Sequence, residues 1–392
     1  MFRLRQLMQL AVCQGKKSWW LVCLLWLVAI VPARAEDLVL RVAIEQDVSQ
    51  VKIGSSTDAT LTDGSGQVVQ AVPAMNAMLL QAKDGQIAID QFRASQLCLE
   101  ASEGGYVFIG SQWYRGSTCV VPTGTGLTAV NYVDLEGYLY SVVGAEMPDG
   151  WHLEALKAQA VAARSYVLYQ RQNSANAIFD VGDTTAWQVY GGVEEETSST
   201  HVAVEETRGQ VLIYGGQIID AVFHACAGGY TENVEDVWSS PLPYLRAVRS
   251  PDEDVPDCQW SQTVTAANLS EQIDYNGTIH SVQLEQNQQQ RVVRVVVQGS
   301  DGQMELSGED VREALGLRST LFSIEPQRGQ VASAGDTVPS TPTNFTIIGR
   351  GYGHGIGLSQ WGAYRLAQQG YNYQQILLHY YTSVSLALIE VE

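Results

Sequence analysis

The sequence predicts an α+β fold, in which strands and helices are interleaved without a regular strand–helix–strand repeat. Residues 36–125 contain short alternating apolar runs separated by glycine turns, which is typical of strands. Residues 134–172 change to helical spacing, and residues 345–392 begin with a glycine-rich run. We therefore expect a strand-rich N-terminal part, central helices with a mixed sheet that forms a cleft, and a Gly-rich strand with two helices at the C-terminus.

Composition divides the chain into six segments. The first is a leader, the next two are a strand-rich part and a core, and the fourth is an inserted strand/helix subdomain. A loop rich in Gly, Ser, Thr and Pro, expected to be flexible, precedes a C-terminal segment that completes the core. Their expected bounds are residues 1–35, 36–125, 126–255, 256–328, 329–344 and 345–392.

The first 35 residues have the pattern of a signal peptide. They carry five basic residues and no acid, then an apolar run from Trp19 to Val31, then Ala33-Arg34-Ala35. The apolar run is shorter than the roughly 20 residues that a spanning helix needs, which favours cleavage over an uncleaved membrane anchor. The segment predicts export to the periplasm, cell envelope or extracellular space.

The charge of the chain excludes one class of partner. The net charge is −19, and removal of the five basic leader residues leaves −24. A body this acidic, with no basic stripe, does not bind nucleic acid or anionic lipid nonspecifically. A neutral or weakly charged substrate such as a glycan fits better.

Four cysteines remain after the expected cleavage, and in an exported chain an even number favours disulfides. Three pairings are possible, of which sequence order favours Cys98–Cys119 and Cys226–Cys258. The alternative is a zinc site formed by His224 with Cys226 and Cys258, although this spacing matches no strong zinc pattern.

Two helices are expected around a short loop. Asp134 is a suitable N-cap for a helix that ends at Gly144, and a second helix spans residues 152–172. The loop of residues 144–150 between them contains Glu146, so a rigid scaffold would present this side chain. The first helix has an apolar stripe at helical spacing, made of Leu135, Tyr138, Leu139, Val142 and Val143.

Further elements follow along the chain. The pair Gly215-Gly216 separates two apolar runs and predicts a hairpin. A second strand pair is expected around Asp301-Gly302, and a helix near residues 309–315. Two closing helices are expected at residues 358–369 and 373–381.

Glu146 is the sharpest catalytic candidate. Its neighbours Ala145, Met147 and Pro148 are uncharged. Desolvation would raise the pKa of the carboxyl group, which a glycosidic acid needs in order to hold its proton near neutral pH. The positive end of the following helix opposes this effect, and an exposed, solvated loop acid is the alternative interpretation.

Glycine occupies every second position from residue 349 to residue 357. In a strand, this spacing would leave one face as bare backbone and place the intervening side chains on the other. The bare face would allow close approach of a sugar chain or another strand, and tight internal packing is the alternative. The intervening residues are Arg350, Tyr352, His354 and Ile356.

Several motifs together resemble the stage II sporulation protein D and amidase-enhancer (LytB-like) family, in order and over nearly all of the mature chain. They include residues 130–139 and 154–166, Thr184 through Tyr190, Gly228 through Glu232, and Asp236-Val237-Trp238. They also include Gly144-Ala145-Glu146-Met147-Pro148, Gly351-Tyr352-Gly353-His354-Gly355 and Ser359-Gln360-Trp361-Gly362-Ala363.

The resemblance implies a secreted or membrane-anchored peptidoglycan enzyme that cuts glycan strands, with no cofactor and no metal. Its partners would be peptidoglycan glycan strands and an N-acetylmuramoyl-alanine amidase that removes the stem peptides. Glu146, in the expected catalytic core of residues 126–255, would be the catalytic residue. The implied substrate-binding residues are Gln188, Tyr190, Thr231, His354 and Gln360.

A single catalytic acid suits a lytic transglycosylase, because the C6 hydroxyl of the muramic acid attacks in place of water. A hydrolase normally uses two carboxyl groups, and Asp149 and Glu232 would be the first candidates for the second one. The rival class is a non-catalytic module that binds glycan or enhances an amidase.

Overall fold

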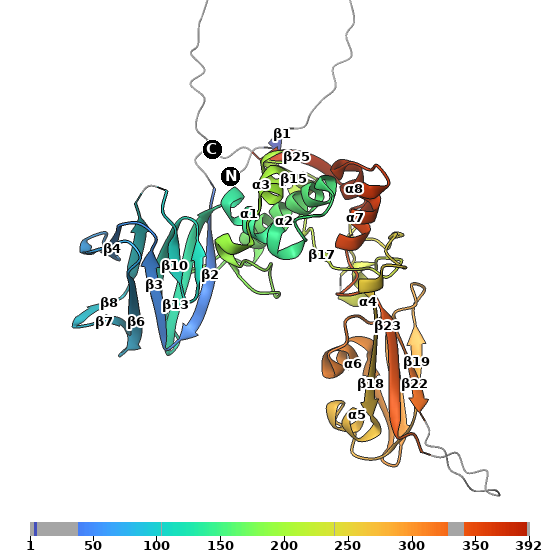
Figure 1. Cartoon of the computed structure of the whole chain (residues 1–392). Coiled ribbons are helices and arrows are strands. Elements are labelled where there is room, and N and C mark those ends of the chain that lie inside the picture. Colours follow the sequence, from blue (N-terminus) through green and yellow to red (C-terminus); the bar gives the residue numbers. More distant parts are fainter. Residues whose placement is uncertain (1–3, 6–37, 103, 239, 328–340, 390–392) are drawn as a thin grey trace, which may run out of the picture. The chain divides into compact units, whose positions relative to one another are not determined.

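The computed structural model describes residues 4–5, 38–102, 104–238, 240–327 and 341–389 (Figure 1). The expected signal peptide lies outside the described residues except for Leu4–Arg5, and so does most of the expected flexible loop. The chain forms two compact units. The first unit comprises Met1–Asp149, Ala163–Ile219 and Ser385–Glu392, and the second comprises Gly150–Ala162 and Asp220–Val384.

The expected α+β class is confirmed. In the first unit, the strand-rich part consists of two antiparallel sheets that pack against each other (Figure 1). The first sheet contains β2 (Val39–Val48), β13 (Gly126–Asp134), β12 (Ser117–Thr123), β9 (Leu97–Ala101), β4 (Ala59–Asp63) and β5 (Val68–Val72), and β14 (Val181–Gly182) joins it in parallel at β2. The second contains β11 (Gln112–Tyr114), β10 (Val107–Ile109), β3 (Gln50–Ser55), β6 (Ala77–Lys83), β7 (Gln86–Ile89) and β8 (Phe92–Ala94).

The expected bond between Cys98 and Cys119 is confirmed, and it joins neighbouring strands of the first sheet. The two residues are directly opposite each other in β9 and β12, with 4.0 Å between their Cα atoms. The bond therefore crosslinks two strands that the sheet already pairs.

Helix α1 (Leu135–Glu146) begins where expected, because Asp134 Oδ1 accepts hydrogen bonds from the first-turn amides of Glu136 and Gly137. The expected end at Gly144 is wrong, since the helix continues to Glu146. A Cβ at Gly144 would lie 1.9 Å from the carbonyl oxygen of Glu195. This glycine therefore gives room to the neighbouring 3₁₀ helix, η1 (Gly192–Glu195), rather than ending α1.

Helix α3 (Ser198–Glu205) and the part of α2 (Leu153–Asn173) from Ala163 onward complete the helical part of the first unit, and the residues of α2 up to Ala162 belong to the second. A buried ion pair joins α2 to α1, with Arg164 Nη2 lying 2.5 Å from Glu136 Oε2. The same guanidinium donates to the carbonyl of Gln210, which begins β15. One charge pair thus ties two helices to a sheet.

The remaining sheet of the first unit contains the expected hairpin. Strands β15 (Gln210–Tyr214) and β16 (Gln217–Ile218) are joined by Gly215 and Gly216, which have φ of 58° and 81°. These left-handed conformations are the ones that a two-residue hairpin turn requires. Strand β25 (Ser385–Ile389) pairs with β15 on its other side, and β1 (Leu4–Arg5) pairs with β25.

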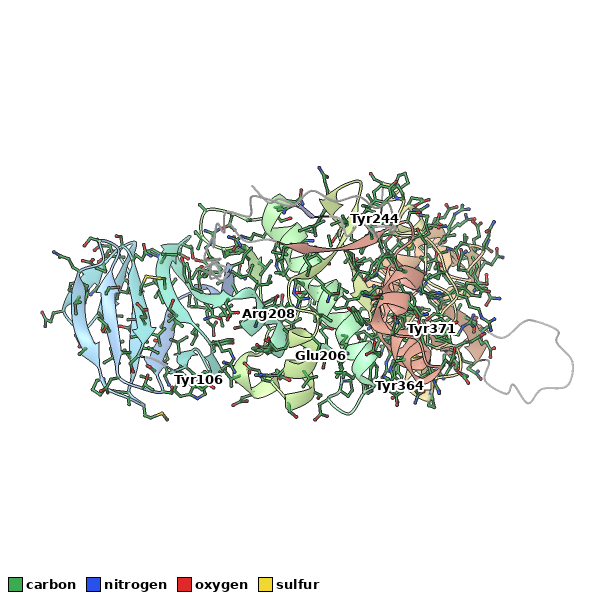
Figure 2. All side chains as sticks on the ribbon, turned by 90° about the horizontal axis from the view of Figure 1, so that it is seen from above. Tyr106, Glu206, Arg208, Tyr244, Tyr364 and Tyr371 are labelled. Carbon is green, nitrogen blue, oxygen red and sulfur yellow. A yellow bond between two sulfur atoms is a disulfide. The ribbon has the colours of Figure 1, made fainter. Side chains whose placement is uncertain are left out.

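The second unit contains the closing helices α7 (Gln360–Gln368) and α8 (Tyr373–Tyr380), close to where they were expected. Figure 2 labels Tyr364 on α7 and Tyr371 in the turn before α8. Strands β17 (Phe223–His224) and β24 (Leu358–Ser359) pair in parallel, and α4 (Val234–Val237) is a single turn. Trp151, which precedes α2, packs on Trp361 with ring centroids 4.6 Å apart.

The second unit also contains an inserted subdomain, made of residues 259–327 and 344–350. Its two three-stranded sheets and two helices share one apolar core. The turn at Asp301-Gly302 and the helix near 309–315 are found as expected. The elements are β18 (Gln259–Thr265), α5 (Ala266–Gln272), β19 (Ile279–Gln286), β20 (Val292–Gly299), β21 (Gly302–Ser307), α6 (Gly308–Leu315), β22 (Phe322–Gln327) and β23 (Asn344–Arg350). β23, which composition placed in the C-terminal segment, pairs with β18 and β22.

The glycine-rich run does not continue as a strand, and this expectation is wrong. β23 ends at Arg350, and the four following glycines, at 351, 353, 355 and 357, have φ between 74° and 104°. Protein atoms fill the space beside them. A Cβ at Gly353 would lie 2.8 Å from the Cβ of His224, and one at Gly355 would lie 2.3 Å from Arg291 Nη2. The glycines thus permit a left-handed backbone and tight internal packing.

Within the parts of the chain that the structure describes, no helix has both the length and the apolar character needed to cross a membrane.

Candidate functional site

Glu146 is the last residue of α1, and its side chain is half-buried. Its Oε1 accepts a long hydrogen bond, 3.4 Å, from the backbone amide of Val189. Met147, which caps the helix, is buried and extended, whereas Pro148 and Asp149 are exposed. The carboxyl group therefore lies at the border between the helical core and solvent, on a rigid helix end.

The amide that contacts Glu146 belongs to a turn with internal hydrogen bonds. The amide of Tyr190 donates to the carbonyl of Asp183 (3.1 Å), and the amide of Trp187 donates to the carbonyl of Thr184 (2.8 Å). These bonds fix the path of residues 183–190, and with it the direction of the Val189 amide.

Gln188 and Tyr190 flank Val189 and are directed into the core. Gln188 is 1% exposed, and its amide accepts from the Tyr138 hydroxyl (3.2 Å) and donates to the carbonyl of Ala163 (3.3 Å). Tyr190 is 2% exposed, and its hydroxyl donates to Asn131 Oδ1 (2.8 Å). Both side chains thus anchor the turn from behind, and neither presents its polar atoms to solvent.

Acidic side chains lie near the buried hydroxyl group of Tyr138. Burial raises the pKa of its hydroxyl well above the usual value, and the nearby Tyr166, Glu146 and Asp183 raise it further. Tyr138 therefore stays protonated and serves as a hydrogen-bond donor to Gln188. The carboxyl groups of Glu146 and Asp183 both lie close enough to act on this one phenol.

Asp183 is a residue that sequence reasoning missed. Its side chain is half-buried, and burial, together with the charge of Glu45, raises the pKa of its carboxyl group from 3.8 to about 6. Nothing in the neighbouring sequence marks it, because Glu45, whose charge acts on it, is far away in the chain.

In the second unit, Thr231 and Gln360 are largely buried. The Thr231 hydroxyl donates to the carbonyl of Arg246 (3.2 Å) and accepts from the amide of Val248 (2.8 Å). Gln360 is 6% exposed and is the first residue of α7, which Ser359 caps through a hydrogen bond from the amide of Gly362. Thr231 holds two chain segments together, and Gln360 is held at the start of a helix.

His354 is half-buried, with both ring nitrogens bonded to the backbone. Nε2 donates to the carbonyl of Phe223 (2.9 Å), and Nδ1 accepts from the amide of Ile356 (3.0 Å). Burial lowers the pKa of the imidazole to about 4, so the ring is neutral at physiological pH. Its ring lies 5.1 Å from that of Trp238, of which 49% is exposed.

The expected disulfide between Cys226 and Cys258 is confirmed, and it removes two of the three zinc ligands that the sequence allowed. His224 is buried, its Nδ1 donates to the carbonyl of Ile356 (3.1 Å), and burial lowers the pKa of its imidazole well below the usual value. In the described part of the chain, no cluster of three or more His, Cys, Asp or Glu side chains is placed to hold a metal ion.

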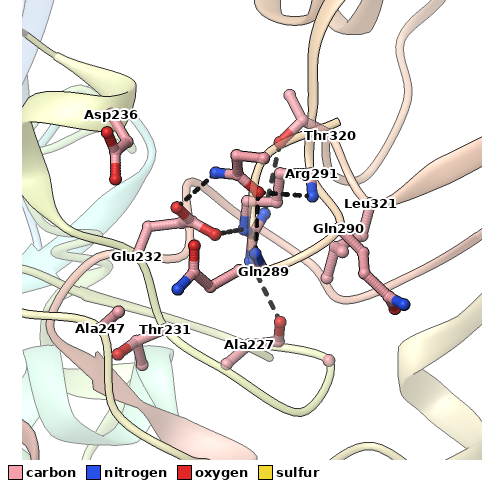
Figure 3. Close-up of polar contacts among 12 residues, drawn as sticks. Ala227, Thr231, Glu232, Asp236, Ala247, Gln289, Gln290, Arg291, Thr320 and Leu321 are labelled. Carbon is pink, nitrogen blue, oxygen red and sulfur yellow. Dashed lines mark hydrogen bonds and ion pairs between the residues drawn. The ribbon is translucent and has the colours of Figure 1, made fainter. Parts of the chain in front are cut away.

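Glu232 forms a buried ion pair with Arg291 of the inserted subdomain (Figure 3). The Arg291 Nε lies 3.3 Å from Glu232 Oε1, and the two side chains are 2% and 0% exposed. Asn287 donates to Glu232 Oε2 (2.8 Å), and Arg291 Nη2 donates to the carbonyl of Ala227 (3.1 Å). Burial nevertheless raises the pKa of Glu232 to about 7. Sequence reasoning missed this pair, because the partners are far apart in the chain.

The structure therefore groups the expected site residues by unit. Glu146, Gln188 and Tyr190 come together in the first unit. Thr231, His354 and Gln360 belong to the second unit, around the glycine-rich run. The convergence of all six at one cleft stays a prediction.

Comparison with known proteins identifies the family. A family model described as stage II sporulation protein matches residues 123–214, which include Glu146, Gln188 and Tyr190. A model described as a domain of unknown function, DUF8618, matches residues 258–357, which include the inserted subdomain.

Several relatives match most of the chain. Stage II sporulation protein D of Bacillus subtilis (strain 168) is 34% identical over 301 residues, which cover 71% of this chain and 82% of that protein. An uncharacterized protein of Brachyspira hyodysenteriae is 32% identical over 289 residues, 73% of this chain and 75% of that protein. The amidase enhancer of Bacillus subtilis (strain 168) is 33% identical over 301 residues, 63% of this chain and 40% of that protein. With this identity and this coverage, the chain belongs to the stage II sporulation protein D family.

Proposed function

We propose that this protein is a lytic transglycosylase that cleaves peptidoglycan glycan strands between muramic acid and glucosamine, with Glu146 as the general acid and then the general base. The observation that carries the proposal is the position of Glu146 at a rigid helix end, half-buried and bonded to the Val189 amide. A proton donor must be held at the substrate in a fixed direction, and this arrangement supplies such a direction.

The chemistry needs one carboxyl group. The Glu146 carboxylic acid protonates the glycosidic oxygen while the bond from this oxygen to the anomeric carbon of the muramic acid breaks. The C6 hydroxyl oxygen of the same sugar then bonds to the anomeric carbon, and its proton passes to the Glu146 carboxylate. The products are a shortened strand with a 1,6-anhydro-muramic end and a strand with a free glucosamine hydroxyl, and Glu146 regains its proton. Because the nucleophile belongs to the substrate, little orientational entropy is lost in its attack.

The candidates for a second carboxylate are poorly suited to activating water. Glu232 is fully buried and paired with Arg291, so a water molecule and a substrate do not reach it. Asp149 is exposed, on the turn that follows Glu146, where solvent rather than the protein surrounds its carboxylate. This contrast favours transglycosylation over hydrolysis.

The roles of the supporting residues follow from their burial. Gln188 and Tyr190 act as positioning residues, since their side chains anchor the turn whose amide contacts Glu146. In the second unit, His354 with the exposed ring of Trp238 presents the surface best suited to stacking on sugar, while Thr231 and Gln360 hold the surrounding backbone.

The site of action would be the cell envelope or its outside. Two disulfides support an oxidising compartment, and the first 35 residues have the pattern of a signal peptide. The substrate would be strands from which an amidase has removed the stem peptides, so such an amidase is the expected partner in the same process.

A specific observation favours a second candidate function. A relative named amidase enhancer matches 63% of this chain, which favours a non-catalytic module that binds glycan or stimulates an amidase.

One experiment separates the two candidates. Purified protein is incubated with peptide-stripped glycan strands, and the products are analysed by mass spectrometry. We expect ends that carry 1,6-anhydro-muramic acid, and the Glu146→Gln protein should bind the strands without producing such ends. Reducing ends would mean that water attacked, and intact strands from both proteins would support the binding module.

A further inference from the structure

A pocket of about 320 Å³ opens on the inserted subdomain, where β18, β22 and β23 meet the turn between β19 and β20. It lies wholly within the second unit and contains none of the residues assigned above to the site. Its polar and exposed lining comes from Gln259, Gln286, Gln290, Ser323, Ile348 and Arg350.

The lining is rich in primary amides and has no carboxylate. Gln259 Nε2 donates to the carbonyl of Glu253 (2.7 Å), and Gln286 Nε2 makes a long bond of 3.5 Å to the carbonyl of Phe322. In the part of the chain with described side chains, the Oε1 atoms of these two residues have no hydrogen-bond partner. Amides placed in this way can both accept from and donate to sugar hydroxyls.

Arg350 supplies the charge of the pocket. Its Nε donates to the carbonyl of Gly228 (2.9 Å), and its Nη2 donates to Gln290 Oε1 (2.6 Å). Both acceptors are neutral, and no carboxylate of the described residues lies within ion-pair distance of Arg350. Two fixed bonds thus orient a guanidinium whose charge is not balanced, in a chain with a net charge of −19.

Three other arginines of the inserted subdomain are paired with carboxylates, whereas Arg318 contacts the carbonyl of Asp257 and the ring of Tyr352. Arg291 is paired with Glu232, Arg294 with Glu285 and Glu305, and Arg312 with Glu309. Arg350 is the arginine that lines the pocket, and among the described residues it has no carboxylate partner. A planar guanidinium with free N–H groups is suited to recognising a carboxylate from a ligand.

We propose that this pocket binds a saccharide that carries a free carboxylate, with Arg350 contacting the carboxylate and the glutamine amides contacting the hydroxyls. Ile348, of which 47% is exposed, gives the ring an apolar surface to lie on. The volume is at the lower end of the range for small-molecule pockets. The proposal rests on the proposed function, because removal of the stem peptide from muramic acid frees its lactyl carboxylate. The pocket would thus distinguish stripped strands from strands that still carry peptide, where this carboxyl group is an amide.

The test measures binding by calorimetry, with every protein carrying Glu146→Gln so that no ligand is cleaved. Three tetrasaccharides are compared: the peptide-stripped peptidoglycan fragment, the same fragment with its lactyl carboxyl groups converted to amides, and neutral chitotetraose. Arg350→Gln is the test variant. Arg294→Gln is the matched control, because Arg294 is an arginine of the same subdomain that lies outside the pocket.

We expect Arg350→Gln to weaken binding of the carboxylated fragment by about 10- to 100-fold, the usual loss for a hydrogen bond between charged groups. Its affinity for the amidated fragment and for chitotetraose should equal that of the control. Should Arg350→Gln fail to fold, as judged by its melting temperature, Gln286→Ala replaces it. That variant removes an exposed amide and should weaken all three ligands by about 3- to 10-fold.

Two results would overturn the proposal: equal affinity of the Arg350-containing protein for the carboxylated and amidated fragments, or equal losses in the Arg350→Gln and Arg294→Gln proteins. The strand-cleavage assay with Glu146 intact reports on the proposed function by itself. Cleavage without a carboxylate preference would contradict only the proposal for the pocket. A carboxylate preference without cleavage would contradict only the proposed transglycosylase activity.

Discussion

Two glutamates, one in each unit, show how the surroundings of a side chain decide its use. Glu146 is half-buried at the end of α1, and the Val189 amide donates a long hydrogen bond to it. Glu232 has no exposed surface, and Arg291 and Asn287 contact its two oxygens. The first borders solvent, as the proposed proton exchange with a substrate requires, whereas the second holds two parts of a fold together.

The largest expected effect is on catalysis at the first of these glutamates. Glu146→Gln keeps the shape of the side chain but removes its ability to give and take a proton, so the cleavage rate should fall by at least about 10²- to 10⁴-fold. Strand cleavage is measured by product mass. Asp149→Asn, which changes an exposed acid three residues later, is the matched control and should keep the parent rate. A Gln variant that cleaves at the parent rate would remove Glu146 from the chemistry.

In the second unit, loss of the cation that pairs with Glu232 should lower the stability of the fold. Arg291→Met leaves Glu232 buried without its cation, and the free energy of unfolding should fall by about 3–5 kcal/mol in urea titrations at pH 8. Arg294→Met removes an arginine from an exposed ion-pair cluster and should cost about 1 kcal/mol or less. Equal losses in the two variants would mean that the buried Glu232–Arg291 pair contributes no more to the free energy of unfolding than an exposed pair.

The same pair predicts a pH dependence. The pKa of Glu232 in the folded protein, about 7, is above the usual value of 4.5. The folded state therefore holds a proton that the unfolded state has lost, and this group makes the free energy of unfolding fall as pH rises from about 4.5 to 7. Without the cation the folded pKa rises further, so the deficit of Arg291→Met should be larger at pH 8 than at pH 6. A deficit that does not change with pH would contradict this coupling.

Gln188 distinguishes positioning from substrate binding in the first unit. Gln188→Met removes the bonds to Tyr138 and Ala163 at similar volume, so the turn that carries the Val189 amide should lose its fixed path. We expect kcat to fall by about 10-fold with little change in KM, since misplacement of a catalytic group acts on the chemical step. Gln170→Met serves as the control, because Gln170 is a half-buried glutamine of α2 whose Oε1 accepts from the Ser174 hydroxyl. A rise in KM at constant kcat would instead assign Gln188 to the substrate.

The smallest expected effect concerns Asp183. Burial raises the pKa of its carboxyl group from 3.8 to about 6, so this group too makes the free energy of unfolding fall with rising pH between these values. Asp183→Asn should remove about 1 kcal/mol of that fall, a figure reduced for the partial exposure of the side chain. Urea titrations of the two proteins at pH 4 and pH 6 measure the difference. Parallel changes in parent and variant would show that Asp183 titrates normally.

Patterns within a few residues were sufficient for several elements. The carboxylate of Asp134 caps α1 because its partners are the amides two and three residues later. Gly215 and Gly216 could be predicted to form the hairpin turn because the turn depends only on their own backbone angles. The disulfide pairings followed from sequence order, and the family resemblance from short motifs, of which Glu146 is part.

Contacts between distant residues decided the rest. Gly144 lies within helix α1 and does not end it, and the carbonyl of Glu195, about fifty residues later, occupies the space that a Cβ at residue 144 would need. The strand ends at Arg350 because the following glycines pack on His224 and Arg291 in left-handed conformations. The sequence by itself thus determined where helices and turns begin, since their hydrogen bonds and backbone angles are local. Only the tertiary structure decided that Gln188 and Tyr190 face the core and that Glu232 meets Arg291, because burial and charge pairing depend on residues that chain order does not place together.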